Sequence, residues 1–299
     1  MTQKKYTIKS INKNIKSSLN QFILKSELGY KKQIESVSQH IAENPLTKFV
    51  MIAGPSSAGK TTTANLLALS LNKLGINTRV LSLDDFFVER EETPLWEDGT
   101  YNYESVNAID WKLFDECVSG LLNKKEVVLP TYNFVTGKKQ LISKAKLLQN
   151  DIIIIEGLHA LNKIIDNFIP KTVSVKIYIS VFSSITNNGK TVLNKMDIRL
   201  LRRMVRDMRC RGTMPKETLI NWTSVNRGEK IYIHPFKKTA NFFIDSFHPY
   251  ELCIYKKMLN DYKNLHREEL PVIDKLLKDF YEVNAEVVPK QSLLREFVG

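Results

Sequence analysis

The chain has 299 residues, enough for one large domain or two modest ones. Hydrophobic residues make up 43% and charged residues 25%, which excludes a mostly disordered chain. No apolar run approaches the ~18 residues of a membrane span, so we expect no membrane contact. Three scattered cysteines, Cys117, Cys210 and Cys253, exclude a disulfide framework and a structural zinc site. A reducing compartment, most simply the cytoplasm, fits best.

The formal net charge of +12 predicts an anionic partner, either nucleic acid, a membrane surface or a phosphorylated small molecule. Half of that charge lies in residues 1–26, which hold six lysines and no acidic residue. We therefore interpret residues 1–27 as a basic, solvated N-terminal extension and expect the fold to occupy residues 28–299. A targeting or nucleic-acid role of this segment is the minor alternative.

The hydrophobic pattern predicts short strands that alternate with helices. Strands are expected at residues 48–53, 78–83, 152–155, 173–179 and 241–244. Helices are expected at residues 28–44, 61–74 and 110–122, and a helical C-terminal region, 249–283, is broken at Pro271. Short runs at 127–129 and 140–142 predict a small inserted β-hairpin. This alternation predicts an α/β fold with a parallel sheet.

The strongest motif is GPSSAGKT at residues 54–61, a full match to GxxxxGK[ST] between a predicted strand and a predicted helix. In such a loop the backbone N–H groups point at phosphate oxygens, and the helix N-terminus adds a positive dipole end. Lys60 is expected to reach the β and γ phosphates and Thr61 to offer its hydroxyl to Mg²⁺. The predicted ATP-binding residues are Gly54, Ser56, Ser57, Ala58, Gly59, Lys60, Thr61 and Thr62.

Carboxylates follow two of the other predicted strands. Asp84 and Asp85 end the second strand, and Glu156 ends the strand at 152–155. The carboxyl ends of parallel strands share one edge of a sheet, where ligands bind. One of these acids would serve as a base for an incoming hydroxyl and another as a Mg²⁺ or water ligand. The alternative is that they are helix caps or turn formers.

Arginines dominate the segment after residue 198. Arg199, Arg202, Arg203 and Arg206 have the spacing of one helical face, and Arg211 follows. Guanidinium groups match phosphate geometry, so we interpret residues 187–214 as an arginine-bearing lid, with a merely solvated face as the alternative. The string NKMD at 194–197 matches a guanine-reading motif, but no DxxG accompanies it and Asp197 is expected to cap the helix.

These motifs together resemble one known family. The segments GPSSAGKT, LSLDDFF, YNYESVNAIDWKLFDE, LPTYNFVTGKK, IIIIEGLHALN and DIRLLRRMVRDMRCRG occur in the order typical of the uridine kinase/phosphoribulokinase family. The sequence is similar in particular to a bacterial branch of nucleoside kinases, down to the C-terminal SLLREFVG. The resemblance implies a P-loop kinase domain over residues 28–299, with a parallel sheet flanked by helices, a small hairpin insertion and an arginine-bearing lid.

The resemblance also implies ATP, Mg²⁺ and a set of roles. Asp84 would be the general base, helped in catalysis by Lys60, Arg206 and Arg211, and Glu156 would be a metal-side carboxylate. The implied metal-site residues are Thr61, Glu156 and Asp84. Glu104 matches a ribose-binding acid, and the implied acceptor-binding residues are Asp84, Glu104, Tyr101, Tyr132, Phe134 and Arg203.

Two departures from the family pattern bear on the substrate. Gly137 stands where uridine kinases carry a base-contacting histidine, and Thr213 stands where an arginine is expected. We expect an ATP- and Mg²⁺-dependent kinase of a small hydroxylated acceptor, first a nucleoside, and alternatively a polyol such as myo-inositol or a sugar. A nucleic-acid-binding ATPase ranks lower, because basic residues and aromatics do not interleave along a strand. A homo-oligomer stays open.

Overall fold

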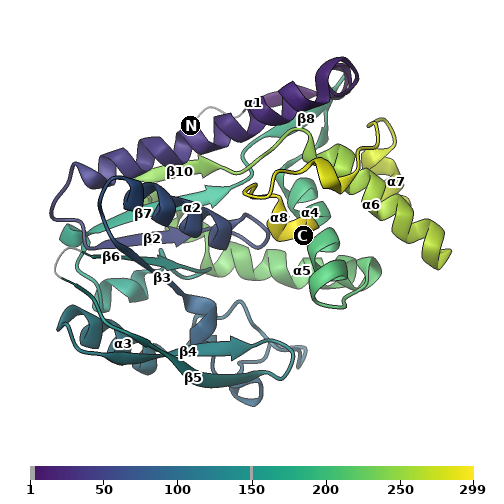
Figure 1. Cartoon of the computed structure of the whole chain (residues 1–299). Helices are drawn as coiled ribbons and strands as arrows, with labels where there is room; N and C mark the ends of the chain where they lie inside the picture. Colours follow the sequence, from purple (N-terminus) through teal and green to yellow (C-terminus); the bar gives the residue numbers. More distant parts are fainter. Residues whose placement is uncertain (1–3, 149–150) are drawn as a thin grey trace.

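A five-stranded parallel sheet forms the centre of the molecule. The computed structural model describes residues 4–148 and 151–299. The strands lie in the order β10-β7-β2-β6-β3 (Figure 1), and all neighbours in this sheet are parallel. Their bounds are β2 (Phe49–Ala53), β3 (Thr78–Ser82), β6 (Ile152–Glu156), β7 (Ser174–Ser180) and β10 (Phe242–Asp245). The predicted α/β class and parallel sheet are confirmed.

Successive residues of each strand enter two different cores, because side chains alternate between the faces of a sheet. Val50 and Ile52 belong to the core that also contains residues of α1 (Ile8–Ala42) and α2 (Lys60–Lys73). Phe49 and Met51 belong to the opposite core, which contains residues of α3 (Trp111–Leu122). Burial on both faces explains why these strands appear in the sequence as unbroken apolar runs.

The N-terminal segment is part of the fold, so the prediction of a solvated extension is wrong for residues 4–27. Strand β1 (Lys5–Thr7) pairs in parallel with β8 (Ser184–Asn187), which continues into an antiparallel pair with β9 (Lys190–Leu193). Thr7 caps α1, and Ile8, Ile11 and Ile23 are buried. The lysines of this segment stay exposed on the other side of α1. The net charge of the segment does not reveal this buried stripe of isoleucines.

The other predicted elements have the expected type. Asp110 caps α3 by accepting from the Leu113 N–H at 3.0 Å. The hairpin is an antiparallel pair of β4 (Val127–Asn133) and β5 (Lys138–Ala145), longer than predicted. The C-terminal region holds α6 (Glu251–His266) and α7 (Pro271–Leu277), so Pro271 begins the second helix, and α8 (Arg295–Val298) follows. No helix within residues 4–148 and 151–299 is long and apolar enough to cross a membrane.

Helices α4 (Lys195–Cys210) and α5 (Pro215–Tyr232) occupy the region predicted as the lid and its continuation. Asn194, and not Asp197, is the N-cap of α4, since its side chain accepts from the Met196 and Asp197 N–H groups. Asp197 is the third helical residue and accepts from the Asn194 N–H at 2.8 Å. The NKMD segment at 194–197 is therefore a capping box, in which the Asn194 and Asp197 side chains each accept from the other residue's backbone N–H.

Candidate active site

The sheet order places the predicted carboxylates beside the glycine-rich loop. The loop follows β2, Asp84 follows β3, and β6 lies between these strands, so Glu156 stands between loop and Asp84. Glu156 Oε1 accepts from Thr61 Oγ1 at 3.0 Å and from Ser82 Oγ at 2.6 Å. Burial first, and the charge of Asp84 second, raise the pKa of Glu156 to about 7. A bound cation would favour its ionised form.

The loop is held in a conformation that only certain residues allow. Gly59 has φ +89°, in the left-handed region. A Cβ on Gly54 would lie 2.2 Å from the Ile179 carbonyl oxygen, so the loop passes too close to β7 for any side chain. Lys60 opens α2, and its Nζ lies 3.5 Å from the Pro55 carbonyl oxygen. The Lys60 ammonium group therefore lies next to the backbone of the loop itself.

Several predicted ATP-binding residues have protein partners. The Ser56 N–H donates to Glu229 Oε1 at 3.0 Å, and Ser56 Oγ accepts from Arg203 at 2.7 Å. Thr62 Oγ1 donates to Glu296 Oε2 at 2.7 Å. Ser57 and Ala58 are buried within the loop. These contacts tie Ser56 to α4 and α5 and Thr62 to the C-terminal segment.

Two of the four helical arginines are structural, so the expectation of one shared phosphate-facing surface is wrong for Arg199 and Arg202. Both are fully buried and bidentate, Arg199 with Glu229 (2.5 and 2.7 Å) and Arg202 with Glu251 (2.7 and 3.1 Å). Each also donates to a loop carbonyl, that of Ser56 at 3.1 Å or Ser57 at 3.3 Å. These contacts hold the loop from behind.

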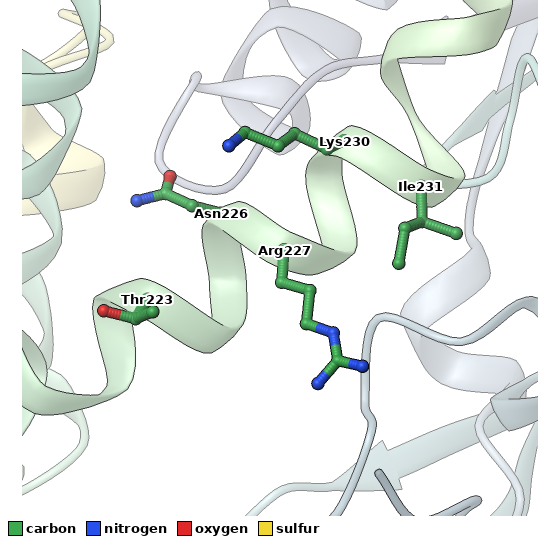
Figure 2. A pocket seen from close by; sticks show the side chains of 5 residues that line it. All are labelled: Thr223, Asn226, Arg227, Lys230 and Ile231. Atoms are coloured by element: carbon green, nitrogen blue, oxygen red, sulfur yellow. The ribbon is translucent and has the colours of Figure 1, made fainter. Parts of the chain in front are cut away.

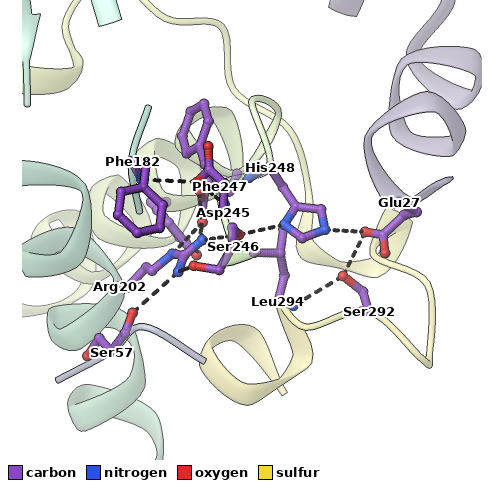
Figure 3. A network of polar contacts seen from close by, with 12 residues as sticks. Glu27, Ser57, Phe182, Arg202, Asp245, Ser246, Phe247, His248, Ser292 and Leu294 are labelled. Atoms are coloured by element: carbon purple, nitrogen blue, oxygen red, sulfur yellow. Dashed lines mark hydrogen bonds and ion pairs between the residues drawn. The ribbon is translucent and has the colours of Figure 1, made fainter. Parts of the chain in front are cut away.

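The Arg202 pair belongs to a larger buried network (Figure 3). Arg202 donates to Ser246 Oγ and its carbonyl, and His248 Nδ1 lies 3.0 Å from that carbonyl. Glu27 of α1 lies 3.6 Å from His248 Nε2 and accepts from Ser292 Oγ at 2.7 Å. The network therefore joins the N-terminal helix, α4 and the C-terminal segment behind the loop.

The remaining arginines gather around one buried acid, Asp207. Its carboxylate lies 3.2 Å from Arg203, 2.8 Å from Arg206 and 3.6 Å from Arg211. Three guanidinium groups share one carboxylate, so the cluster keeps an excess of positive charge. Burial lowers the pKa of Arg203 and of Arg211, which is the cost of holding these cations together. Such a cluster suits an anion such as a phosphate.

The predicted acceptor residues come from two places. Glu104 packs against α5, whereas Tyr132 and Phe134 belong to the β4–β5 hairpin. Glu104 is half-buried, and burial, then the charge of Glu229, raise its pKa to about 7. Tyr132 is buried and packs edge-on against Phe134, whose ring carries Arg211 at 5.7 Å. Tyr101 is 42% exposed and contacts Tyr103 instead. Phe134 thus connects the hairpin aromatics to the arginines around Asp207, whereas Tyr101 contacts neither group.

Sequence reasoning missed the acids that organise the arginines. Glu229 and Glu251 lie far from Arg199 and Arg202 in the chain, and no spacing pattern connects them. Asp207 carried a signal, because it stands four residues after Arg203 and four before Arg211, the spacing of helical ion pairs. Of these three acids, Asp207 is the one whose role the sequence spacing indicates.

One hollow lies on α5 and another lies beside the loop. A pocket of about 400 Å³ lies on one face of α5 (Figure 2), and its lining residues are Thr223, Asn226, Arg227, Lys230 and Ile231. Arg227 stacks over the Trp96 ring at 4.2 Å, which ties this face to the loop before Glu104. A smaller hollow of about 100 Å³ lies below the loop at Pro55 and is lined by Lys195, His234 and Lys237, among others.

The residues present fit a nucleotide and its Mg²⁺. Thr61, Glu156 and Asp84 offer hard oxygen donors beside Lys60, which is the chemistry that Mg²⁺ prefers. No cluster of three or more His, Cys, Asp or Glu residues suited to a metal occurs in the described part of the chain.

Comparison with known proteins decides the family. Residues 49–252 match the Phosphoribulokinase / Uridine kinase family. The chain belongs to this family. A uridine kinase of Staphylococcus aureus (strain JH9) is 30% identical over 200 residues, which cover 66% of this chain and 87% of the relative. A uridine kinase of Ureaplasma parvum serovar 3 is 26% identical over 193 residues, 64% and 84% of the two chains.

A solved structure supports the fold. A kinase described as part of a fructose transport system in Silicibacter sp. TM1040 superposes with a TM-score of 0.50 at 15% identity, covering 70% of this chain and 98% of that one. Family membership and fold agree with the resemblance that the motifs indicated. The protein is a P-loop kinase, an ATP-dependent phosphotransferase that acts on a hydroxyl group.

Proposed function

We propose that the protein phosphorylates a hydroxyl of a nucleoside, with Mg²⁺, and that it discriminates poorly among bases. The observation that carries this is the placement of the loop, Asp84 and Glu104 around one edge of the sheet. The strand order brings Asp84 to the loop edge. Glu104 packs against Gly228 of α5, and the next residue, Glu229, accepts from the Ser56 N–H of the loop. The relatives named uridine kinase support a nucleoside acceptor. Bound Mg²⁺ and ATP would supply the activated γ-phosphoryl group.

Each residue then has one task. Asp84 accepts the proton of the attacking hydroxyl, because it follows β3 at the edge where loop and acceptor meet. Lys60 and the arginines around Asp207 neutralise charge on the transferred phosphoryl group. Thr61 and Glu156 offer oxygen atoms to Mg²⁺ or to its water ligands. Glu104, Tyr132 and Phe134 orient the acceptor.

Weak base discrimination follows from the hairpin tip. Gly137 has φ +72°, and a Cβ there would lie 2.7 Å from Arg90 Nε. The Arg90 guanidinium donates to the Phe134 carbonyl at 2.7 Å, and the Arg90 side chain occupies the space that a side chain at position 137 would need. This observation favours a second candidate, a polyol kinase, because such a site keeps hydroxyl recognition while losing a base contact.

The test is a phosphate-transfer assay over uridine, cytidine, adenosine, guanosine and myo-inositol, with kcat/KM measured for each. We expect nucleosides within about tenfold of one another or myo-inositol above all of them, because Gly137 offers no side chain to a base edge. Asp84→Asn should lower kcat by about 10² or more with little change in the KM for ATP. A preference for uridine and cytidine beyond about a hundredfold contradicts the proposal.

A further inference from the structure

The smaller hollow, of about 100 Å³, lies where three parts of the chain meet beside the start of the phosphate loop. Tyr178 and Ser180 come from the carboxyl end of β7, and Lys195 begins α4. His234 and Lys237 belong to the short 3-10 helix that follows α5. Segments far apart in the sequence therefore line one small cavity.

The lining carries positive charge that the fold does not neutralise. Arg199 lines the hollow too, but its charge is paired with Glu229. Lys195 and Lys237 form no ion pair with a carboxylate of residues 4–148 and 151–299, and no Asp or Glu of these residues lines the hollow. Burial first, and the charge of Lys195 second, lower the pKa of Lys237. The two ammonium groups thus repel each other across a small space.

Two aromatic rings hold Lys237 in place. Its Nζ lies 4.8 Å from the centre of the Phe182 ring and 5.3 Å from the centre of the Tyr178 ring. A cation over the face of a ring is attracted by the ring's quadrupole, and the attraction is stronger where water is excluded. The ammonium group is therefore positioned beside the hollow, while its charge stays available to an anion.

Two buried hydroxyl groups in the lining have no partner within the described part of the chain. Tyr178 is 3% exposed and Ser180 is 4% exposed, and neither side chain makes a hydrogen bond to another described residue. Buried hydroxyl groups are normally hydrogen-bonded, because leaving the bond unmade costs free energy. Burial raises the pKa of Tyr178 to about 12, so its hydroxyl keeps its proton and can donate. The hollow thus offers two neutral donors beside two ammonium groups.

The charge and size of the hollow fit the phosphate group of a small molecule. A phosphate monoester carries about −1.5 to −2 near pH 7, which matches two ammonium groups, whereas a carboxylate carries one charge. Pockets for drug-sized ligands measure about 300–1,000 Å³, so a hollow of about 100 Å³ holds one phosphate group and not a whole nucleotide. Lys195 and His234 are exposed at its border, so the rest of a phosphate ester can extend into solvent.

We propose that this hollow is a second phosphate-binding site, separate from the phosphate loop. Its ligating side chains are Tyr178, Ser180, Lys195 and Lys237. Pro55 is the one residue of the loop in its lining, and Lys60, Asp84 and Glu156 are not part of it. The site therefore takes inorganic phosphate, or the phosphate group of a monoester, that does not take part in the transfer reaction.

Calorimetric titration tests the site. Inorganic phosphate and ethyl phosphate are titrated separately into the full chain carrying Lys60→Ala, which removes the lysine of the loop. We expect one binding site, and the probe that binds more tightly identifies the source of the phosphate group. Adding Lys237→Met should weaken binding by about tenfold or more, because a charge-assisted contact is lost while the aliphatic stem remains. Adding Tyr178→Phe keeps the ring, removes one donor and should weaken binding by about threefold or more.

Lys238→Met is the matched control, because Lys238 is the next residue, is exposed and does not line the hollow. It should leave the affinity for both probes within about twofold, and thermal unfolding without phosphate checks that each variant is folded. The site is overturned if neither probe binds to the Lys60→Ala protein. It is also overturned if Lys237→Met and Lys238→Met weaken binding equally, or if Tyr178→Phe has no effect.

A second measurement uses the ring of His234 as a reporter. Burial lowers its pKa, the charge of Glu229 raises it, and the charges of Lys195, Arg199 and Lys237 lower it further. A bound phosphate would offset these positive charges, so the pKa of His234 should rise when the site is filled. The chain has 5 histidines, so each ring can be followed by NMR after isotopic labelling, with His234→Gln giving the assignment. An unchanged pKa at saturating phosphate, or an equal rise in Lys237→Met, overturns the site.

Discussion

Single residues at the active edge hold charge that the fold does not fully compensate. Glu104 lies near two other acids, Glu229 and Asp84, and its pKa is raised to about 7, chiefly by burial. Between its ordinary value of 4.5 and about 7, the folded protein therefore binds a proton that the unfolded chain releases. Stability falls as pH rises through this window. Above about pH 7 the Glu104 carboxylate is ionised in the folded protein, and burying this charge lowers the free energy of unfolding by its full amount.

We expect Glu104→Gln to raise the free energy of unfolding at pH 8 by about 2 kcal/mol, because the amide cannot ionise. The gain should shrink toward zero below pH 4.5, where the wild-type carboxyl is protonated in both states. Urea unfolding at several pH values measures it. Glu97→Gln is the control, since the Glu97 side chain is 93% exposed and should show no such trend. A constant gain at every pH would exclude ionisation as the cause.

At the scale of elements, α5 is packed against the acceptor side through a glycine. A Cβ on Gly228 would lie 2.3 Å from Glu104 Cβ and 2.5 Å from its Cγ. These atoms are close to the Glu104 backbone, so the segment that carries Glu104 would have to move. The glycine thus fixes the distance between α5 and Glu104.

Gly228→Ala should therefore lower kcat/KM for the acceptor by at least about tenfold with a small change in the KM for ATP, because a displacement near 1 Å costs on this order. Steady-state kinetics with each substrate varied checks it. Gly29→Ala in α1 is the matched control, since nothing lies within 4 Å of its Cβ position. It should raise the free energy of unfolding by up to about 1 kcal/mol and leave activity unchanged. Equal kinetics in the two variants would contradict this role of Gly228.

The sequence predicted elements best where a local pattern determines them. Apolar runs such as residues 152–155 become central strands because the core of a strand buried on both faces favours apolar residues. The phosphate loop was predicted because its glycines and Lys60 are contiguous. Arg199 and Arg202 were assigned to the wrong environment because their acids, Glu229 and Glu251, come from distant helices. Only the tertiary fold reveals which arginines lose access to a ligand.

The N-terminal helix was also assigned to the wrong environment, in this case solvent instead of the core. Its lysines dominate the charge count, yet Ile8, Ile11 and Ile23 decide its place by burying apolar surface.

At the scale of the whole molecule, the last residues of the chain support the loop near its middle. Leu293 is fully buried, and its side chain fills the space beside Gly59, where a Cβ would lie 2.5 Å from Leu293 Cδ1. Phe297 of α8 lies 5.0 Å below the Arg202 guanidinium, and Glu296 accepts from Thr62. The C-terminal segment therefore contacts the loop, its helix and the arginine that braces it.

We expect Leu293→Ala to raise the KM for ATP by about tenfold, since the loop amides lose the support that keeps them converging on one anion. It should also lower the free energy of unfolding by about 2–5 kcal/mol through the cavity left behind. Leu277→Ala in α7 is the matched control, because Leu277 is 2% exposed and belongs to the same core. Its stability loss should be similar, with the KM for ATP unchanged. If both variants raise the KM for ATP equally, general loosening of the core explains the effect, and the C-terminal segment has no specific role in shaping the loop.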